Sequence, residues 1–137
     1  MAKGDHIRVR RFGYWHHGID CGDGTVIHYS GEPFKRKGSA VMRTPYTEFA
    51  RGRVVEVVEH AGAFHPDYVL NRAMDRLGED TYCVFRNNCE HFARWCKTGV
   101  KESRQVRSKT SIAATVVFFL AVLLLFRRIP KPLRRFI

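Results

Sequence analysis

Cys89 lies in the segment Asn88-Cys89-Glu90-His91-Phe92, where its thiol falls on the first turn of a predicted helix. Asn is a preferred helix N-cap, so Asn88 would make Cys89 the first helical residue, and Gly99 would end the helix. The positive partial charge at a helix N-terminus stabilises a thiolate, which predicts a lowered pKa and a nucleophilic role for this thiol. A buried structural cysteine is the competing interpretation of a single cysteine on an apolar helix face.

The helical spacing also predicts which way this thiol points. Cys89, Phe92, Ala93 and Cys96 fall at i, i+3, i+4 and i+7 and therefore share one face of the helix. We expect this apolar face, and the thiol with it, to pack against the rest of the protein.

Three histidines near the N-terminus are candidates for the imidazole that a cysteine nucleophile needs as its base. His16, His17 and His28 flank Gly22-Asp23-Gly24, a turn signal that predicts a hairpin between two short strands. A three-residue loop would place His28 on the face of His16, whereas a two-residue turn would place it on the face of His17. The sequence leaves both registers open.

Together these segments resemble the two signature boxes of the lecithin:retinol acyltransferase family. The boxes are His16-His17-Gly18-Ile19 with Gly22-Asp23-Gly24 and Val26-Ile27-His28, and Asn88 to Phe92. The similarity runs from about Gly4 to Val106, in a family that includes the H-Ras-like suppressor phospholipases and acyltransferases. It implies an α+β fold, a circularly permuted relative of the NlpC and papain-like thiol hydrolases. A small antiparallel sheet carrying the histidines would pack on the helix that carries the nucleophilic cysteine.

The resemblance also implies roles for individual residues. By matching position, Cys89 is the nucleophile, His16 the general base, and His28 the second histidine, which orients His16 or accepts its proton. His17 occupies a position that is usually aromatic in the family, so we interpret it as a packing residue on the opposite face.

Two further residues share the strand face of His16. Asp20 stands where the family commonly has Tyr, and it could raise the pKa of the imidazole. Because Asp is poorly suited to a strand interior, a solvent-exposed position at the strand end is the favoured interpretation. The hydroxyl of Tyr14 is a candidate oxyanion donor, with a half-buried strand tyrosine as the alternative.

The charge distribution argues against nucleic-acid binding. The net charge is +11, but residues 1–100 carry 15 basic and 12 acidic side chains, whereas residues 101–137 carry 9 basic and 1 acidic. The basic residues of this C-terminal part lie on both sides of an uncharged run of 17 residues, 110–126. As a helix this run is about 26 Å long, close to the thickness of a bilayer core. Lys109 and Arg127 could extend to the interfaces, so we expect a transmembrane helix.

These features predict four segments: a catalytic domain (1–106), a basic linker (107–109), a transmembrane helix (110–126) and a basic tail (127–137). No signal peptide is evident at the N-terminus, so we expect a C-terminal anchor in a single-pass membrane protein with its catalytic domain facing the cytosol. The basic residues of the tail do not follow the positive-inside tendency, which leaves the orientation of the tail open. The four cysteines lack metal-ligand spacing, and no cofactor or metal is expected.

Other stretches predict the elements that position the candidate site. Strands are expected at 7–11, 54–58 and 81–85, and a turn-rich loop at 31–47. Pro66 and Gly78 would bound a helix with a buried stripe formed by Val69, Leu70, Ala73, Met74 and Leu77.

The predicted function is that of a membrane-anchored thiol acyltransferase and phospholipase. It would form an acyl thioester on Cys89 from a glycerophospholipid and pass the acyl group to water, an amine or an alcohol. A papain-like thiol peptidase or amidase, and a non-catalytic binding or membrane-remodelling module of the same fold, are the alternatives.

Overall fold

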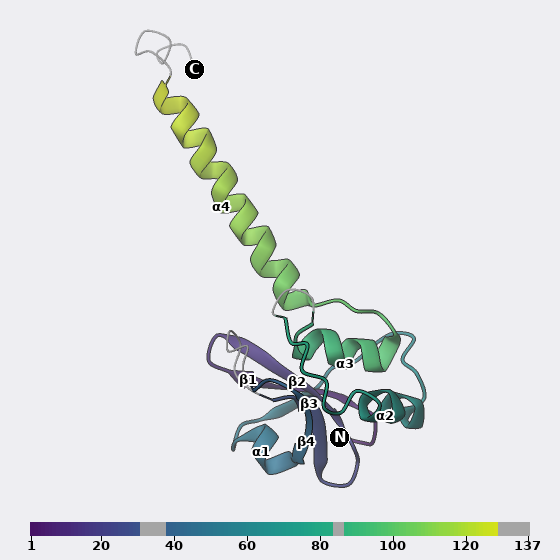
Figure 1. The fold of residues 1–137 in the computed structure, drawn as a ribbon. Coiled ribbons are helices and arrows are strands. Elements are labelled where there is room, and N and C mark those ends of the chain that lie inside the picture. Colours follow the sequence, from purple (N-terminus) through teal and green to yellow (C-terminus); the bar gives the residue numbers. More distant parts are fainter. Residues whose placement is uncertain (31–37, 84–86, 129–137) are drawn as a thin grey trace. The chain divides into compact units, whose positions relative to one another are not determined.

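The computed structural model describes residues 1–30, 38–83 and 87–128. The chain divides into two compact units, the first spanning residues 1–105 and the second beginning at Val106. In chain order the elements are β1 (His6–Arg11), β2 (Tyr14–Asp20), β3 (Thr25–Tyr29), β4 (Val41–Pro45), α1 (Tyr46–Ala50), β5 (Val55–Val57), α2 (Pro66–Met74), α3 (Cys89–Thr98) and α4 (Arg104–Arg128) (Figure 1).

The five strands form one antiparallel sheet in the order β4-β3-β2-β1-β5. Ile19 pairs with Ile27 across the β2–β3 hairpin, and the N–H of Cys21 donates to the carbonyl of Thr25 at 3.0 Å. The loop therefore has three residues, and the register places His28 on the face of His16. This is the first of the two alternatives that the sequence left open.

Two clusters of buried residues cover the two faces of the sheet. One contains Ile19, Ile27 and Tyr29 with residues of α2 and α3, and the other contains Ile7, Val9, Val26 and Phe49 of α1. A Cβ at Gly18 would lie 2.7 Å from Val26 Cγ1 and 3.1 Å from the Phe49 ring, so only glycine lets α1 approach β2 this closely. The predicted α+β arrangement, a small antiparallel sheet with the cysteine helix packed on it, is confirmed.

Several local expectations are corrected. The expected loop 31–47 contains β4 and the start of α1, with residues 31–37 lying outside the described part. β4 has only five residues, with no regular alternation of apolar and polar side chains, and it forms through its pairing with β3. Of the expected strand 81–85, residues 84–86 are not described, and Cys83 makes an isolated bridge with Asn87.

The helix expected to reach Gly78 ends earlier. α2 stops at Met74, and turns follow up to Gly78, whose φ is 85°. Met74 and Leu77 are each 40 % exposed, so the buried stripe of α2 is limited to Val69 and Ala73 with half-buried Leu70.

α4 begins earlier than predicted, so the residues expected as a linker (107–109) are helical. Its segment Arg104–Leu125 has 22 residues and a mean hydropathy of 2.0, which makes it long and apolar enough to cross a membrane. A helix of this length rises about 33 Å, close to a hydrocarbon core of about 30 Å. The side chains of its apolar stretch are exposed, for example Val117 at 65 % and Leu124 at 60 %, which does not fit a core helix. The tail after Arg128 lies outside the described residues.

Candidate active site

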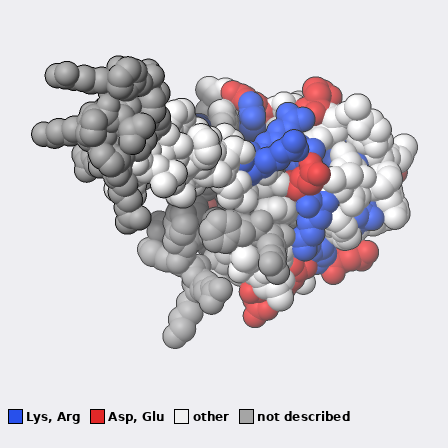
Figure 2. Space-filling view, turned by 90° about the horizontal axis from the view of Figure 1, so that it is seen from above, with Lys and Arg blue, Asp and Glu red and all other residues white. Residues whose placement is uncertain are grey.

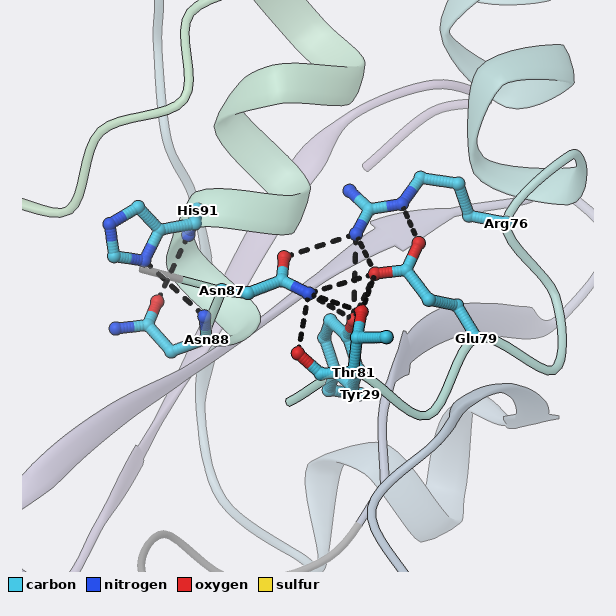
Figure 3. A network of polar contacts seen from close by, with 7 residues as sticks. All are labelled: Tyr29, Arg76, Glu79, Thr81, Asn87, Asn88 and His91. Carbon is cyan, nitrogen blue, oxygen red and sulfur yellow. Dashed lines mark hydrogen bonds and ion pairs between the residues drawn. The ribbon is translucent and has the colours of Figure 1, made fainter. Parts of the chain in front are cut away.

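The start of α3 is fixed by reciprocal hydrogen bonds of Asn88 and His91. Asn88 Oδ1 accepts the backbone N–H groups of Glu90 and His91, each at 3.0 Å, and His91 Nδ1 accepts the N–H of Asn88 at 3.3 Å (Figure 3). This is a capping box, in which two N–H groups without helical partners are satisfied by side chains. Cys89 is therefore the first residue of the helix, and Gly99 ends it in the left-handed conformation, as the sequence predicted.

A second polar network holds the residue before the cap. Asn87 Nδ2 donates to Tyr29 Oη and to Glu79 Oε1 at 2.8 Å each, and to the carbonyl of Thr81 at 2.9 Å. Asn87 Oδ1 accepts from Arg76 Nη2 at 3.1 Å, and Arg76 pairs with Glu79 (Figure 3). This network ties the chain just before α3 to β3, directly beside His28.

The thiol of Cys89 is buried against the backbone of β2. Its residue is 6 % exposed, and Sγ lies 3.8 Å from the carbonyl oxygen of Trp15, to which the thiol can donate. The backbone N–H of His17 also hydrogen-bonds the sulfur. These two main-chain groups belong to the residues on either side of His16, so the sulfur lies beside the β2 backbone at His16.

Burial raises the pKa of the Cys89 thiol to about 11, although the backbone N–H groups of His17, Glu90 and Cys89 itself act in the opposite direction. The expectation of a lowered pKa at the helix N-terminus is therefore wrong. The free energy needed to remove a thiolate from water exceeds the stabilisation that the nearby N–H groups and the helix dipole provide. The thiol is protonated at neutral pH and needs a base.

His16 and His28 form a buried imidazole pair, each about 7 % exposed. His16 Nε2 lies 3.0 Å from His28 Nδ1, and their rings are nearly perpendicular. His28 Nδ1 also lies 2.9 Å from the carbonyl of Tyr29, and its Nε2 lies 2.9 Å from Thr44 Oγ1. The pKa of each imidazole is lowered, chiefly by burial, so both rings are neutral at neutral pH. A neutral imidazole is the form that accepts a proton.

Aromatic rings hold His16 in place. Phe49 of α1 packs against the His16 ring at 5.2 Å between centroids, and the ring of half-buried Tyr14 lies edge-on to it at 6.4 Å. Thr44 and Phe49 come from β4 and α1, elements that the sequence did not predict. Tyr14 is placed beside the base, but its role as an oxyanion donor stays a prediction.

His17 lies on the opposite face of β2 and is 3 % exposed, in a chain of histidines. His17 Nδ1 lies 2.8 Å from His6 Nε2, and His6 Nδ1 lies 2.7 Å from His60 Nε2. The predicted face is confirmed, but His17 is hydrogen-bonded, whereas an apolar packing role was expected. Burial lowers its pKa to about 4, although Glu90 acts in the opposite direction. Adjacent ring nitrogens at these distances share hydrogen bonds, and the described residues contain no group of three ligand side chains arranged for a metal ion.

The beginning of α4 is bonded to the candidate site. The Glu90 carboxylate accepts from Ser103 Oγ at 2.5 Å and from the N–H groups of Arg104 and Gln105 at 3.1 Å each. The Gln105 amide in turn accepts from the N–H of Trp15 at 2.8 Å and donates to its carbonyl at 3.1 Å. That carbonyl is the one that Cys89 Sγ contacts, so Gln105 fixes an atom beside the thiol. Sequence reasoning missed Glu90 and Gln105 because their partners are distant in the chain.

The sequence predicted a solvent-exposed Asp20, but the structure buries it. It is 8 % exposed, and its Oδ1 accepts the N–H of Gly22 at 2.7 Å. The carboxylate therefore closes the β2–β3 loop, a turn role for which Asp is well suited.

Comparison with known proteins gives a consistent set of relatives. Residues 1–102 match the family model described as "Lecithin retinol acyltransferase". The chain is 28 % identical to the Homo sapiens protein "Phospholipase A and acyltransferase 2", over 86 % of this chain and 83 % of that protein. It is 27 % identical to "Phospholipase A and acyltransferase 4" of Homo sapiens, over 88 % and 83 % respectively. It is 26 % identical to "Lecithin retinol acyltransferase" of Mus musculus, over 77 % of this chain and 58 % of that protein.

Proposed function

The chain belongs to the lecithin retinol acyltransferase family, and we propose that it is a membrane-anchored cysteine enzyme that takes acyl groups from glycerophospholipids. Relatives named as phospholipases and acyltransferases support this class of activity. The observation that carries the proposal is the position of Cys89 Sγ, at the start of a capped helix and between the main-chain groups that flank His16.

In the proposed mechanism His16 is the general base and Cys89 the nucleophile. We assign His16 the tautomer that carries its proton on Nε2, donates to His28 Nδ1, and accepts the thiol proton at Nδ1. In this assignment His28 carries its own proton on Nε2 and donates it to Thr44 Oγ1, so its Nδ1 does not donate to the Tyr29 carbonyl. Because the pKa of the thiol is about 11 and that of the imidazole is lowered, a free thiolate would be scarce. Proton transfer therefore accompanies attack on the ester carbonyl.

The remaining steps follow from this attack. Formation of the S–C bond gives a tetrahedral intermediate, and its collapse breaks the ester C–O bond. The imidazolium of His16 returns its proton to the lysophospholipid oxygen. Water, an amine or an alcohol then gives a proton to His16, attacks the acyl thioester and releases the thiol.

Few hydrogen-bond donors at the start of α3 are available to stabilise the oxyanion. The N–H groups of Glu90 and His91 already donate to Asn88, so they are engaged by the cap. We assign the oxyanion to the N–H of Cys89 at the helix start and to the hydroxyl of Tyr14, which lies next to His16.

The same proposal covers the organisation of the chain. Residues 1–106 form the catalytic domain, followed by the basic linker (107–109), the transmembrane helix (110–126) as a C-terminal anchor, and the basic tail (127–137). The catalytic domain faces the cytosol. Two histidine strands that precede the cysteine helix support a circularly permuted papain-like fold.

Intact-protein mass spectrometry after incubation with phosphatidylcholine vesicles tests the chemistry. We expect a covalent acyl mass that maps to Cys89 and is absent from Cys89→Ala. Cys83→Ala is the matched control, because Cys83 is a partly exposed cysteine outside the proposed machinery, and it should retain the adduct. Lipid turnover with no acyl mass on Cys89 in a rapid-quench experiment would contradict the thioester.

Removal of the anchor tests the membrane part of the proposal. A protein truncated after Val106 keeps Gln105 and its bonds to Trp15, so it should still hydrolyse a soluble short-chain ester. Its activity on vesicles should fall, because anchoring raises the effective concentration of a membrane-confined substrate. An unchanged ratio of vesicle to soluble-ester activity would show that the helix serves only to place the protein.

A non-catalytic lipid-binding module is the second candidate, favoured by one observation. The Cys89 thiol is buried and its pKa is raised, which is usual for structural cysteines. The same mass spectrum decides between the two, since a binding module acquires no acyl group and produces no lysophospholipid.

A further inference from the structure

Two neighbouring turns of the first unit expose apolar side chains among arginines. They are the β1–β2 turn, residues 10–14, and the α1–β5 turn, residues 51–54, called here the arginine surface. Phe12 is 99 % exposed at the tip of the first turn, and Val54 is 82 % exposed in the second. Neither segment contains an acidic residue. A solvated aromatic ring leaves a large apolar area in water, and its contact with an apolar partner would remove that area from water.

Hydrogen bonds hold the two turns side by side. Arg53 Nη1 donates to the carbonyl of Arg10 at 3.3 Å. Arg11 Nη2 donates to the carbonyl of Phe49, at the end of α1 just before the second turn. The arginine surface is therefore one structural feature built from two chain segments.

Among the described residues, the arginines of this surface form no salt bridge with Asp or Glu. The pKa of Arg11 is lowered by burial and then by repulsion from Arg51 and Arg53, and the hydrogen bonds of Arg11 and Arg53 join the two turns. Among the described residues Arg11 Nη1 is buried without a hydrogen-bond partner. Other arginines differ: Arg8 pairs with Glu56, and on the face drawn in Figure 2 basic and acidic side chains lie next to one another. Arg10 lies over the Trp15 ring at 5.2 Å, a contact that leaves its charge without an anionic partner. Exposed arginines without ion pairs favour an anionic partner.

The arginine surface lies next to the candidate active site. Arg11 donates to the carbonyl of Phe49, whose ring packs against His16 and His28 at 5.2 and 5.3 Å between centroids. After burial, repulsion from Arg11 and Arg51 is among the causes that lower the pKa of both imidazoles. Tyr14, at the end of the first turn, lies edge-on to His16. A partner bound to this surface would therefore lie close to Cys89 and its base.

Chain connectivity also keeps this surface near the proposed anchor. Phe12 is three residues from Trp15, at most about 10 Å along a strand. Trp15 is hydrogen-bonded to Gln105 in the first turn of α4. The uncharged run begins five residues later, about 8 Å along a helix. A bilayer that holds this run is therefore within a few tens of ångströms of Phe12.

We propose that the arginine surface binds an anionic phospholipid bilayer. Phe12 and Val54 enter the interface, and the exposed Arg10, Arg51 and Arg53 bind headgroup phosphates, which turns the Cys89 site toward the membrane. This inference rests on the membrane location in the proposed function but not on catalysis. A bilayer fits better than a nucleic acid, because it supplies both the phosphates for the arginines and an apolar layer for Phe12 and Val54.

The test places a fluorescent reporter at the turn tip in the full chain. Phe12→Trp and the matched control Tyr68→Trp, which replaces an aromatic side chain that is 51 % exposed on α2, are each made in a Cys89→Ala background and reconstituted in vesicles. Vesicles contain phosphatidylcholine alone or with phosphatidylserine, each with and without brominated acyl chains. The emission added by Phe12→Trp over the background protein should be blue-shifted and quenched by brominated lipid, more strongly with phosphatidylserine. The emission added by Tyr68→Trp should be unaffected.

Two results would overturn the proposal. One is added Phe12→Trp emission that brominated lipid leaves unquenched. The other is an emission shift produced by RNA or an acidic peptide without vesicles, combined with no quenching by lipid. Adding Arg10→Gln and Arg53→Gln to Phe12→Trp should remove the extra quenching on phosphatidylserine vesicles, and an unchanged signal would exclude a role for the arginines. Because Cys89 is replaced throughout, failure of the catalytic proposal leaves these outcomes unaffected.

Discussion

His16 and His17 are neighbours on β2, and the two faces of this strand give them different surroundings. Both imidazoles are buried, both have a lowered pKa, and both make a close contact with another histidine ring. His16 lies with His28, Thr44 and Phe49 on the side of α1, whereas His17 lies with His6 and Gln105 on the opposite face of β2.

The comparison teaches that burial and a lowered pKa do not distinguish the proposed base, His16, from His17, for which we propose a structural role. The two histidines differ in the residues to which their hydrogen bonds connect them. The contacts of His16 end inside the protein, at the hydroxyl of Thr44 and the carbonyl of Tyr29. Those of His17 continue through His6 to His60, which is partly exposed, and through Gln105 to the start of α4. The first set can orient an imidazole, and the second joins separate segments of the chain.

The largest effect is expected at the Cys89 thiol, which contacts the β2 backbone on either side of His16. Cys89→Ala should abolish turnover, a loss of at least a thousandfold, because no other group can carry the acyl chain. Cys96→Ala should cost only packing, on the order of 1 to 2 kcal/mol, since Cys96 is fully buried in the core. Phospholipid hydrolysis and thermal unfolding, measured side by side, separate the two. Full activity of a folded Cys89→Ala protein would rule out a thiol enzyme.

Substitutions of His16 and His17, compared with each other, test which of the two is the base. His16→Ala should lower kcat about 10²- to 10⁴-fold, the usual contribution of a general base. His17→Phe should keep most activity but lower the free energy of unfolding by about 1–3 kcal/mol, because His6 and Gln105 lose hydrogen-bond partners. Turnover of a soluble ester is the measurement. The opposite ranking of the two variants would identify His17 as the base.

Gln105→Ala tests whether the contacts on the His17 face of β2 position the Cys89 thiol. Gln105 holds both main-chain groups of Trp15, whose carbonyl contacts Cys89 Sγ, so its loss should misplace the thiol and lower kcat about tenfold. Arg104→Ala is the matched control, since Arg104 is exposed and its contact with Glu90 is made by the main chain. The rate of alkylation of Cys89 is the second readout. A change confined to unfolding temperature would mean that Gln105 only stabilises the fold.

The smallest expected effect is a dependence of stability on pH. Burial holds the pKa of His17 at about 4, below its unfolded value of about 6.5. Between these values the unfolded chain binds the proton that the folded chain excludes, so stability is complete above about pH 6.5 and decreases as the pH falls toward 4. His6, His16 and His28 act in the same direction. Thermal unfolding of His17→Phe should therefore depend less on pH in this window than that of the wild type, and parallel curves would contradict the neutral buried state of His17.

Local sequence signals were sufficient where one turn or one cap decides the structure. Asn88 and Gly99 bound α3 because a side-chain acceptor at one end and a left-handed residue at the other are local requirements. The same holds for the hairpin around residues 22–24 and for the apolar run of α4, whose composition alone identifies it. The family boxes lie within these segments, which explains why they could be recognised.

Long-range contacts were not predictable from the same signals. β4 forms because β3 offers it a partner, and Thr44 reaches His28 only through that pairing. The expected low pKa of Cys89 failed for a related reason, because the local helix dipole was known but the depth of burial was not. Asp20 was misplaced because its turn hydrogen bond depends on the three-residue loop, one of two that the sequence allowed.

The sequence by itself determined the residue types, the helix carrying Cys89, the family and the apolar run of the C-terminal helix, since each depends on neighbours within a few positions. The tertiary structure decided the hairpin register, and with it which histidine lies with His28. It also decided the hydrogen bond between Gln105 and Trp15 and the contact between the turns that carry Phe12 and Val54. The physical reason is that strand pairing and burial arise from segments far apart in the chain, and a shift of one residue in register would exchange the two faces of β2.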